Sequence, residues 1–537
     1  MSELAAPDLF AAAAAIDVAD GVIGAGVAAM TEAGGPDQAQ VLAYDLAHAA
    51  AGAATARAML DYGARGDIEG RLTCAFAADV IHDLIGRLVG REEHWGVKPD
   101  ALDGARSFLA TFRDPSFVAA LADQPGPRHL DDDMELVQDT FRAFATNVVA
   151  PHAEHVHRTN GDVPEEVISG LAEVGAFGLS VPVEYGGYSE GGDAEYLAMV
   201  IATEELSRAS LGIGGSLITR PEILTRALVK GGTEDQKMEW LPKLATAEVM
   251  AAVAVTEPDF GSDVAGLKVT ATPAEGADGT RGYVINGVKT WCTFAARADA
   301  LMLLARTDPD RAAAHRGLSL FIVPKPRGDG HGFEFIQEAD AGAAGRTGKM
   351  EGRPIDTIGY RGMHSYELAL EDWWVPAANL IGGADGLGRG FYFQMEGFEN
   401  GRLQTAARAL GVMQAAYEEA LEYAHNRRVF GAPIYDYELT RAKLGRMAAL
   451  IQAGRQFSYH VARLMARGQG AMEASMVKAF VCKAAEWVTR EALQIHGGMG
   501  YAEEFTVSRL FVDARVLSIF EGADETLCLK VIARRLA

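Results

Sequence analysis

The feature that most constrains the fold of this chain is a change of pattern in its middle third. Short apolar and β-branched runs separated by turn residues fill about residues 250–380, whereas apolar residues at helical spacing dominate on both sides. Asn286-Gly287 between two of these runs predicts a tight hairpin, because a primed turn needs positive φ at both central residues. The predicted strands are 251–256, 268–272, 283–292, 300–305, 318–323 and 366–375.

Helical patterning flanks this β block. Residues 1 to about 128 are Ala-rich, and the segment 124–128 holds two prolines and a glycine, which predicts a boundary. The stretch 338–354 is polar and Gly-rich, so we interpret it as an inserted surface loop. Long apolar periodicity runs through 394–424, 438–467 and 470–495. The predicted domains are 1–130, 131–250, 251–385 and 386–537.

Composition narrows the class of protein. The 537 residues carry 49 basic and 73 acidic side chains, a net charge of −24, which argues against nucleic acid or anionic lipid as partners. No stretch approaches ~18 uninterrupted apolar residues, so no membrane insertion is expected. The first basic residue is Arg57, which argues against a secretory signal or mitochondrial presequence. Four widely spaced cysteines favour a reduced compartment without structural zinc, and we expect a cytoplasmic protein.

Two segments of the β block suit a cofactor. After the first predicted strand, a turn gathers Thr256, Gly261 and Ser262, whose hydroxyls and backbone N–H groups suit a phosphate or the carbonyl edge of a flavin. Trp291 and Thr293 end a later strand, where the indole would cover a planar ring. Taken singly, each has an ordinary alternative: a polar turn after a strand, and a tryptophan in the core.

Two segments near the C-terminus suit catalysis. Gln494 to Tyr501 is a Gly-rich turn after a helix, and Glu521 stands between Phe520 and a glycine. Apolar surroundings raise the pKa of a carboxylate, which suits a general base, although a solvated Glu before a helix is the plainer interpretation. The three histidines of 152–157 place at most two side chains on one helix face, so we predict no metal site.

In order and spacing, these four segments resemble the acyl-CoA dehydrogenase family of flavoproteins, over about residues 131–537. Arg427 to Gly431 is similar to the family's Arg-x-x-Phe-Gly loop, and Trp374-Val375-Pro376 closes the β domain as in the family. The resemblance implies an α+β multi-domain fold with a helical N-terminal domain, a central β domain and a C-terminal four-helix bundle. The extra N-terminal helical extension before residue 131 is unusual within the family.

The resemblance also implies FAD as the cofactor. Arg427 and Phe430 match residues that reach the FAD of a neighbouring subunit, which implies a homo-oligomer, dimer or tetramer. Electrons would leave to an electron-transfer flavoprotein. The positions that match the cofactor site are Val255, Thr256, Gly261, Ser262, Trp291, Thr293, Arg427, Phe430, Gln494, Gly497, Gly498 and Glu525.

By the same resemblance, Glu521 is the base that removes the α-proton of an acyl-CoA thioester, while the β-hydrogen passes as hydride to flavin N5. Some family members place the base on the helix that carries Arg402, but here that position is Gly401, which cannot act. Glu399 and Arg402 match a helix that contacts the pantetheine and thioester region, with Ser262 also on the substrate side.

The extension, the insertion 338–354 and the run 358–367 are most similar to family members that oxidise (2S)-methylsuccinyl-CoA to mesaconyl-CoA. Isobutyryl-, butyryl- and glutaryl-CoA are alternative substrates. A remote alternative for the function is a non-catalytic paralogue.

A short substrate with a second carboxylate needs a small pocket and a charge partner, because an unpaired buried carboxylate is very costly. Phe260 is a candidate volume reducer. Arg220 is the favoured charge partner, ahead of His364 and Tyr366, since Pro221 would open the helix and let the arginine turn inward. The alternative is an exposed arginine at a helix break.

Overall fold

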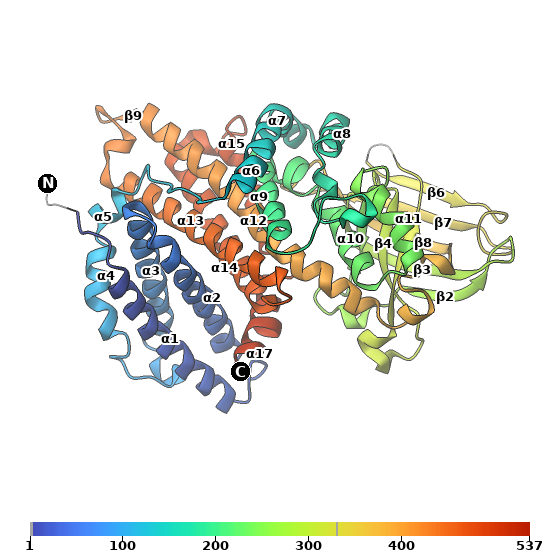
Figure 1. Cartoon of the computed structure of the whole chain (residues 1–537), viewed down its shortest axis with the longest axis horizontal. Coiled ribbons are helices and arrows are strands. Elements are labelled where there is room, and N and C mark those ends of the chain that lie inside the picture. The colour runs from blue at the N-terminus through green and yellow to red at the C-terminus, as the bar shows by residue number, and fades with distance from the viewer. Residues whose placement is uncertain (1–3, 329–330) are drawn as a thin grey trace. The chain divides into compact units, whose positions relative to one another are not determined.

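The computed structural model describes residues 4–328 and 331–537, and the contacts among them divide the chain into two compact units (Figure 1). The first unit comprises residues 1–139, 207–209 and 402–537. The second comprises residues 140–206 and 210–401. The predicted extension and the C-terminal helices therefore belong to the same unit.

The first unit is built almost wholly of helices. The blue helices α1–α3 of the extension pack on one another, and α2 and α3 also pack against the orange α13 (Figure 1). The rings of Phe76 and Phe480 meet edge to face at 5.5 Å between the two halves of this core. The main helices are α1 (Leu9–Glu32), α2 (Gln40–Gly63), α3 (Asp67–Leu88), α4 (Arg106–Phe112), α5 (Pro115–Ala119), α12 (Gly390–Asn426, from Arg402 on), α13 (Glu438–Ala466), α14 (Ala471–His496), α15 (Thr506–Leu517), α16 (Asp524–Thr526) and α17 (Ala533–Leu536).

Small side chains explain why these helices approach so closely. The buried face of α2 consists largely of alanines, and a Cβ added to Gly52 would lie 3.1 Å from Val80 on α3. The end of the extension is also attached to this core, since Tyr417 Oη on α12 donates to the carbonyl of Ala122 at 2.8 Å. The extension is therefore an integral layer of this unit's core.

Within the described residues, α1 is the one helix long and apolar enough to cross a membrane by length and composition. Asp17 and Asp20 interrupt its apolar run, so α1 still holds no uninterrupted apolar stretch of ~18 residues. Its buried side chains, which include Ile16 and Val22, pack against α2 and α3. Asp17 and Asp20 on the same helix pair with Arg57 of α2, as in a helix that covers a protein core.

The second unit centres on an eight-stranded sheet. Its path runs β1-β4-β2-β3-β8-β7-β6, and β5 pairs with β4. The β1–β4 and β2–β4 pairs are parallel, and the others are antiparallel. The strands are β1 (Ala251–Ala254), β2 (Thr270–Glu275), β3 (Arg281–Thr293), β4 (Ala300–Arg306), β5 (Leu318–Pro324), β6 (Phe333–Gln337), β7 (Gly348–Ile355) and β8 (Ser365–Pro376).

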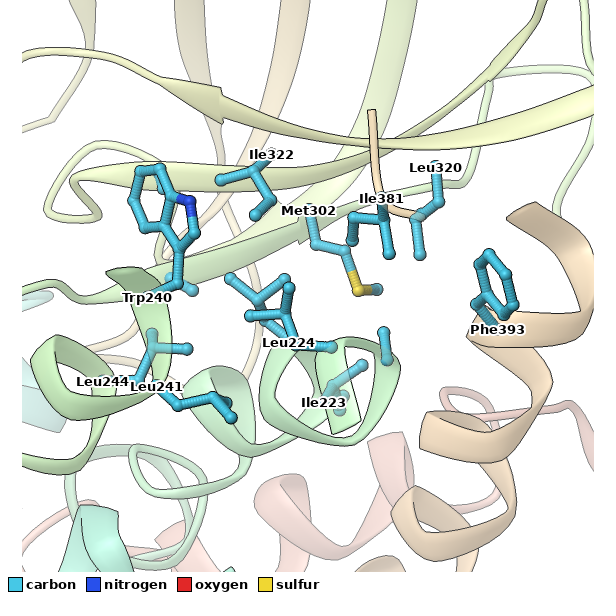
Figure 2. Packing of buried hydrophobic residues seen from close by; sticks show 14 of the residues in the cluster. Ile223, Leu224, Trp240, Leu241, Leu244, Met302, Leu320, Ile322, Ile381 and Phe393 are labelled. Atoms are coloured by element: carbon cyan, nitrogen blue, oxygen red, sulfur yellow. The ribbon is translucent and has the colours of Figure 1, made fainter. Parts of the chain in front are cut away.

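Two helices, α10 and α11, pack against one face of this sheet, as Figure 2 shows. Leu224 and Trp240 from the helices meet Met302 and Ile322 from β4 and β5 in a fully apolar cluster. This core fixes the helix that carries Arg220. The other helices of the unit are α6 (Asp132–Phe144, from Thr140 on), α7 (Ala150–Thr159), α8 (Glu165–Glu173) and α9 (Asp193–Ala209, to Leu206); the two named above are α10 (Thr219–Gly231) and α11 (Glu234–Ala245).

The predicted order of helices, a β block and helices is confirmed, but two local predictions are wrong. Asn286-Gly287 forms no hairpin: both residues lie inside β3, at a bulge where Asn286 exchanges hydrogen bonds with Asp372 of β8. Pairing with β2 and β8 on both sides outweighs the local turn preference. The stretch 338–354 is only partly a loop, because β7 runs through it and buries Met350 between β6 and β8.

Candidate active site

The predicted site residues divide between the two units. Those of the β block lie in the second unit, and those near the C-terminus lie in the first.

In the second unit, a buried ion pair shapes the loop after β1. Lys289 Nζ contacts Glu257 Oε1 at 2.9 Å and donates to the carbonyl of Val255 at 2.9 Å, with both charged side chains buried. The Glu257 carboxylate also accepts the backbone N–H groups of Lys268 and Val269, at 2.7 and 2.9 Å. Burial lowers the pKa of Lys289, and the Glu257 charge opposes that shift. The pair ties both ends of the loop to β3.

This anchoring leaves the middle of the loop accessible. Glu257 and Phe260 exchange two backbone hydrogen bonds, which closes a tight turn, and Gly261 and Ser262 follow it as exposed residues. The Phe260 ring packs over Gly266 and lies 5.0 Å from Lys268 Nζ. Its predicted role in narrowing an acyl pocket stays a prediction.

Trp291 lies beside this loop at a bulge in β3. The register of β3 on β8 shifts between Lys289 and Cys292, and Trp291 adopts a φ of 56°. A bulge re-aims one side chain out of the regular alternation. The indole is therefore 55% exposed, whereas Thr293 two residues later is buried and shares a hydrogen bond with Ser365 at 3.1 Å. The alternative of a core tryptophan is wrong.

These features fit the flavin that the resemblance implies. The half-exposed Trp291 follows Thr290, whose backbone N–H donates to the carbonyl of Thr256 at 2.8 Å, and Gly261 and Ser262 farther along the same loop are exposed. A planar ring bound on the indole would cover this aromatic face. Val255 is buried below the loop and supports it.

Arg220 also lies in the second unit, in the first turn of α10. Arg220 is only 6% exposed, so the alternative interpretation, an exposed arginine at a helix break, is wrong. Pro221 does not open a helix. It occupies the first turn of α10, where its missing N–H costs no helical hydrogen bond. The preceding helix α9 ends at Ala209, and the extended Ser210 with a separate π-helical turn over Leu211–Gly215 supplies the break.

The weaker candidates for a charge partner lie elsewhere in the second unit. His364 pairs with Asp162 at 3.0 Å, and its ring lies 4.2 Å from the His331 ring between centroids, with the two planes tilted by 54°. Tyr366 is buried in β8, and burial raises its pKa. Glu399, near the end of this unit, is partly buried on α12.

In the first unit, Glu521 occupies a tight turn between α15 and α16. Its φ of 53° and that of Gly522, 96°, are both positive, and the Asp524 N–H closes the turn on the Ser518 carbonyl at 3.1 Å. The buried Lys478 of α14 donates to the carbonyl of Gly522 at 2.8 Å. Burial lowers the pKa of Lys478. Glu521 is partly buried, and Glu525 is exposed.

The residues predicted to serve a neighbouring FAD are exposed on the same unit. Phe430 and Gly431 form the positive-φ tip of a small hairpin between β9 (Arg428–Val429) and β10 (Ala432–Pro433). Phe430 is 99% exposed. Arg427 precedes this hairpin and is exposed.

Three further positions that the sequence predicts to contact the cofactor lie at the end of α14 in this unit. Gln494, Gly497 and Gly498 are exposed, and a Cβ on either glycine would meet nothing within 4 Å. Arg402 is buried on α12.

Sequence reasoning missed the groups that hold these loops. Lys289 stands in the predicted strand 283–292, and a charged residue at a core position was the available signal for its partner Glu257. Nothing in the sequence linked the extension to the Glu521 turn. Yet Tyr44 and His48 of α2 both bind Asp524 there, at 2.6 and 3.1 Å.

Among the described residues, two groups of three side chains lie close enough to hold a metal ion: His48, Asp524 and Cys528, and Asp162, His331 and His364. In the first group His48 is hydrogen-bonded to Asp524 at 3.1 Å, and in the second His364 lies 3.0 Å from Asp162 as an ion pair. The predicted absence of a metal stays a prediction.

Comparison with known proteins identifies the family. Three acyl-CoA dehydrogenase models match the chain: the N-terminal domain over 131–248, the middle domain over 252–373 and the C-terminal domain over 388–537. The (2S)-methylsuccinyl-CoA dehydrogenase of Cereibacter sphaeroides is 42% identical over 412 residues, which cover 76% of this chain and 71% of that protein. The mitochondrial isovaleryl-CoA dehydrogenase of Solanum tuberosum is 34% identical over 74% of this chain and 88% of that protein.

A solved structure agrees. Glutaryl-coenzyme A dehydrogenase in complex with glutaryl-CoA is 30% identical and superposes with a TM-score of 0.66, over 75% of this chain and 95% of that one. The predicted fold class is thereby confirmed. The chain belongs to the acyl-CoA dehydrogenase family of FAD-dependent oxidoreductases.

Proposed function

We propose that this acyl-CoA dehydrogenase oxidises (2S)-methylsuccinyl-CoA to mesaconyl-CoA. Its 42% identity to a methylsuccinyl-CoA dehydrogenase supports the proposal, but relatives that are 34% identical carry the names of other substrates. The names of relatives do not decide the substrate. The proposal therefore rests on a feature of this chain itself, the buried Arg220 at the start of α10.

Arg220 suits the distal carboxylate of a dicarboxylic substrate. The stretch 209–219 before it carries no charged side chain, and a buried guanidinium keeps its positive charge. The first turn of α10 adds the positive end of the helix dipole. Glu222 lies in the same turn, where Ser180 donates to it at 3.0 Å, and Arg226 pairs with Glu222 at 2.9 Å and also with Glu195.

Glu521 is the proposed base. A carboxylate is a weak base for the α-proton of a thioester, so its orientation and the stabilisation of the enolate oxygen decide the rate. The turn from Ser518 to Asp524 holds the Glu521 backbone in one conformation, and its backbone N–H is a candidate donor to that oxygen. When bound, FAD supplies the hydride acceptor.

The exposed Phe430 supports assembly as a homo-oligomer in which this hairpin serves a neighbour's cofactor site. Phe430 is 99% exposed at the tip of the hairpin, and packing it against a neighbouring subunit would remove apolar surface from water. An electron-transfer flavoprotein is the proposed electron acceptor, and the cytoplasm the proposed location.

Arg220→Met tests the substrate assignment, because methionine keeps an unbranched stem and removes the charge. We expect turnover of methylsuccinyl-CoA to fall at least about a hundredfold, the size of effect expected when a buried charge loses its partner. Butyryl-CoA turnover, however small, should hold or rise. The matched control is Lys230→Met at the other end of α10, where the lysine is exposed and pairs with Glu396 at 3.1 Å.

Equal losses on both substrates would contradict the role of Arg220. Preference of the wild type for isobutyryl- or butyryl-CoA would favour a monocarboxylic substrate, and preference for glutaryl-CoA would favour a longer dicarboxylic one.

A further inference from the structure

The turn that carries Glu521 is bound from the N-terminal extension. Tyr44 Oη donates to Asp524 Oδ2 at 2.6 Å, and His48 Nε2 lies 3.1 Å from the same oxygen. Tyr44 and His48 are one helical turn apart on α2, and their rings meet edge to face at 4.7 Å. Asp524 is buried, and it lies three residues after Glu521. We name Tyr44, His48 and Asp524 the α2 clamp.

The clamp acts on a backbone that does not hold its conformation unaided. A positive φ at a residue with a side chain, such as the 53° of Glu521, persists only where the surroundings enforce it. One restraint is Lys478, which donates to the carbonyl of Gly522 at 2.8 Å. A second restraint is Asp524, whose backbone closes the turn on Ser518 and whose carboxylate is held by the clamp.

The pKa of Asp524 agrees with this geometry. Burial by itself would raise that pKa, but hydrogen bonds from His48 and Tyr44, together with the charges of His48 and Lys483, bring it down to about 2. The carboxylate is therefore ionised near neutral pH, where it accepts both hydrogen bonds. Charge-assisted hydrogen bonds of this kind are about twice as strong as neutral ones.

A second contact between the extension and the C-terminus has a different character. Asp37 pairs with Lys530 at 2.5 Å and with Arg534 at 2.8 Å, and all three side chains are about half exposed. Exposed pairs contribute little to stability. This contact ties the same two segments together without touching the Glu521 turn, so it offers a matched control.

We propose that Tyr44 and His48 are positioning residues for Glu521, acting through Asp524. The inference rests on the proposed function, in which Glu521 is the base. In this arrangement the extension fixes the orientation of the carboxylate relative to the α-carbon of the substrate. A displacement of about 1 Å at a reacting group costs up to about a hundredfold in rate. Loss of the clamp therefore lowers kcat and leaves substrate binding, and so KM, nearly unchanged.

The test uses the full-length holoenzyme with the acyl-CoA that the wild type oxidises fastest, so that a wrong substrate assignment does not affect it. The Tyr44→Phe/His48→Leu double variant removes both donors. We expect kcat to fall at least about tenfold while KM and flavin content change less than about threefold. Restoring a donor, in Tyr44→Phe/His48→Gln, should recover part of kcat. Asp37→Asn should leave kcat within about twofold of the wild type.

Hydrogen exchange gives a readout independent of activity. The double variant should exchange the amides of residues 518–527 faster, whereas Asp37→Asn should not, because it leaves the Asp524 carboxylate paired. If the double variant loses its flavin, Tyr44→Phe alone decides by the same two readouts. Unchanged kcat with unchanged exchange would overturn the proposal, as would a rise in KM at constant kcat.

Glu521→Gln, measured in parallel, separates this inference from the proposed function. If that variant turns over like the wild type, Glu521 is not the base, and the positioning role falls with it even if exchange in 518–527 still responds to the clamp. If Glu521→Gln is inactive but the clamp variants keep wild-type kcat, only the positioning role is wrong.

Discussion

The buried pair of Lys289 and Glu257 offers a sharp test of how the loop after β1 is held. Lys289→Met would leave the Glu257 carboxylate buried without its cation, and removing one partner of such a pair costs about 3–5 kcal/mol. Glu257 keeps two backbone N–H donors, those of Lys268 and Val269, which places the expected cost near the lower end, about 3 kcal/mol. That energy corresponds to about a hundredfold in the equilibrium for opening the loop.

The assay is an equilibrium urea titration of the holoenzyme, followed by flavin release and by far-UV circular dichroism. The matched control is Lys268→Met in the same loop, since Lys268 pairs with Asp259 at 3.0 Å with side chains 49% and 73% exposed. It should cost less than about 1 kcal/mol. The Glu257→Gln/Lys289→Met double variant should be more stable than Lys289→Met, because no unpaired charge remains. Equal costs for Lys289→Met and Lys268→Met would refute the reasoning.

Three further predictions follow from the same structure. Glu521→Gln should keep FAD and substrate binding, but its turnover should fall at least about a hundredfold, the lower end of what general-base catalysis contributes. Stopped-flow measurement of flavin reduction would show this loss. A smaller loss would require another base. Because the pKa of Asp524 is lowered to about 2, its ionised form stabilises the fold above about pH 4, and about 1–2 kcal/mol of stability is lost as pH falls toward 2. The advantage of the wild type over Asp524→Asn in urea unfolding should therefore shrink across that range, and a constant difference would contradict the assignment. Light scattering on the holoenzyme should show a homo-oligomer with one FAD per subunit, whereas a monomer that retains flavin would contradict the role of Arg427 and Phe430.

The sequence predicted the long elements well, because their patterns repeat over many residues. The helices over 394–424, 438–467 and 470–495 correspond to α12, α13 and α14. Asn286-Gly287 misled because a two-residue turn signal is local, whereas pairing with β2 and β8 extends along the whole strand. β7 was missed because its glycines and charged residues weaken the strand pattern, and its stability comes from two neighbouring strands.

The candidate site was predictable only where residues adjoin in sequence. Trp291 and Glu521 could be singled out as candidates because their motifs are short and contiguous. The supports of those motifs were not, because Lys289 lies 32 residues from Glu257 and Tyr44 lies 480 residues from Asp524. No local pattern encodes such pairings. The exposure of Arg220 was likewise undecidable from the chain, since burial depends on the packing of α10 against the sheet.

The most direct test of the central claim is turnover of the wild-type enzyme on a panel of acyl-CoA thioesters, followed by dye reduction. The panel contains both enantiomers of methylsuccinyl-CoA together with butyryl-, isobutyryl- and glutaryl-CoA. The account predicts the highest kcat/KM for (2S)-methylsuccinyl-CoA, with mesaconyl-CoA as the product, and at least about tenfold less for every other member. A higher kcat/KM for any other thioester would contradict it.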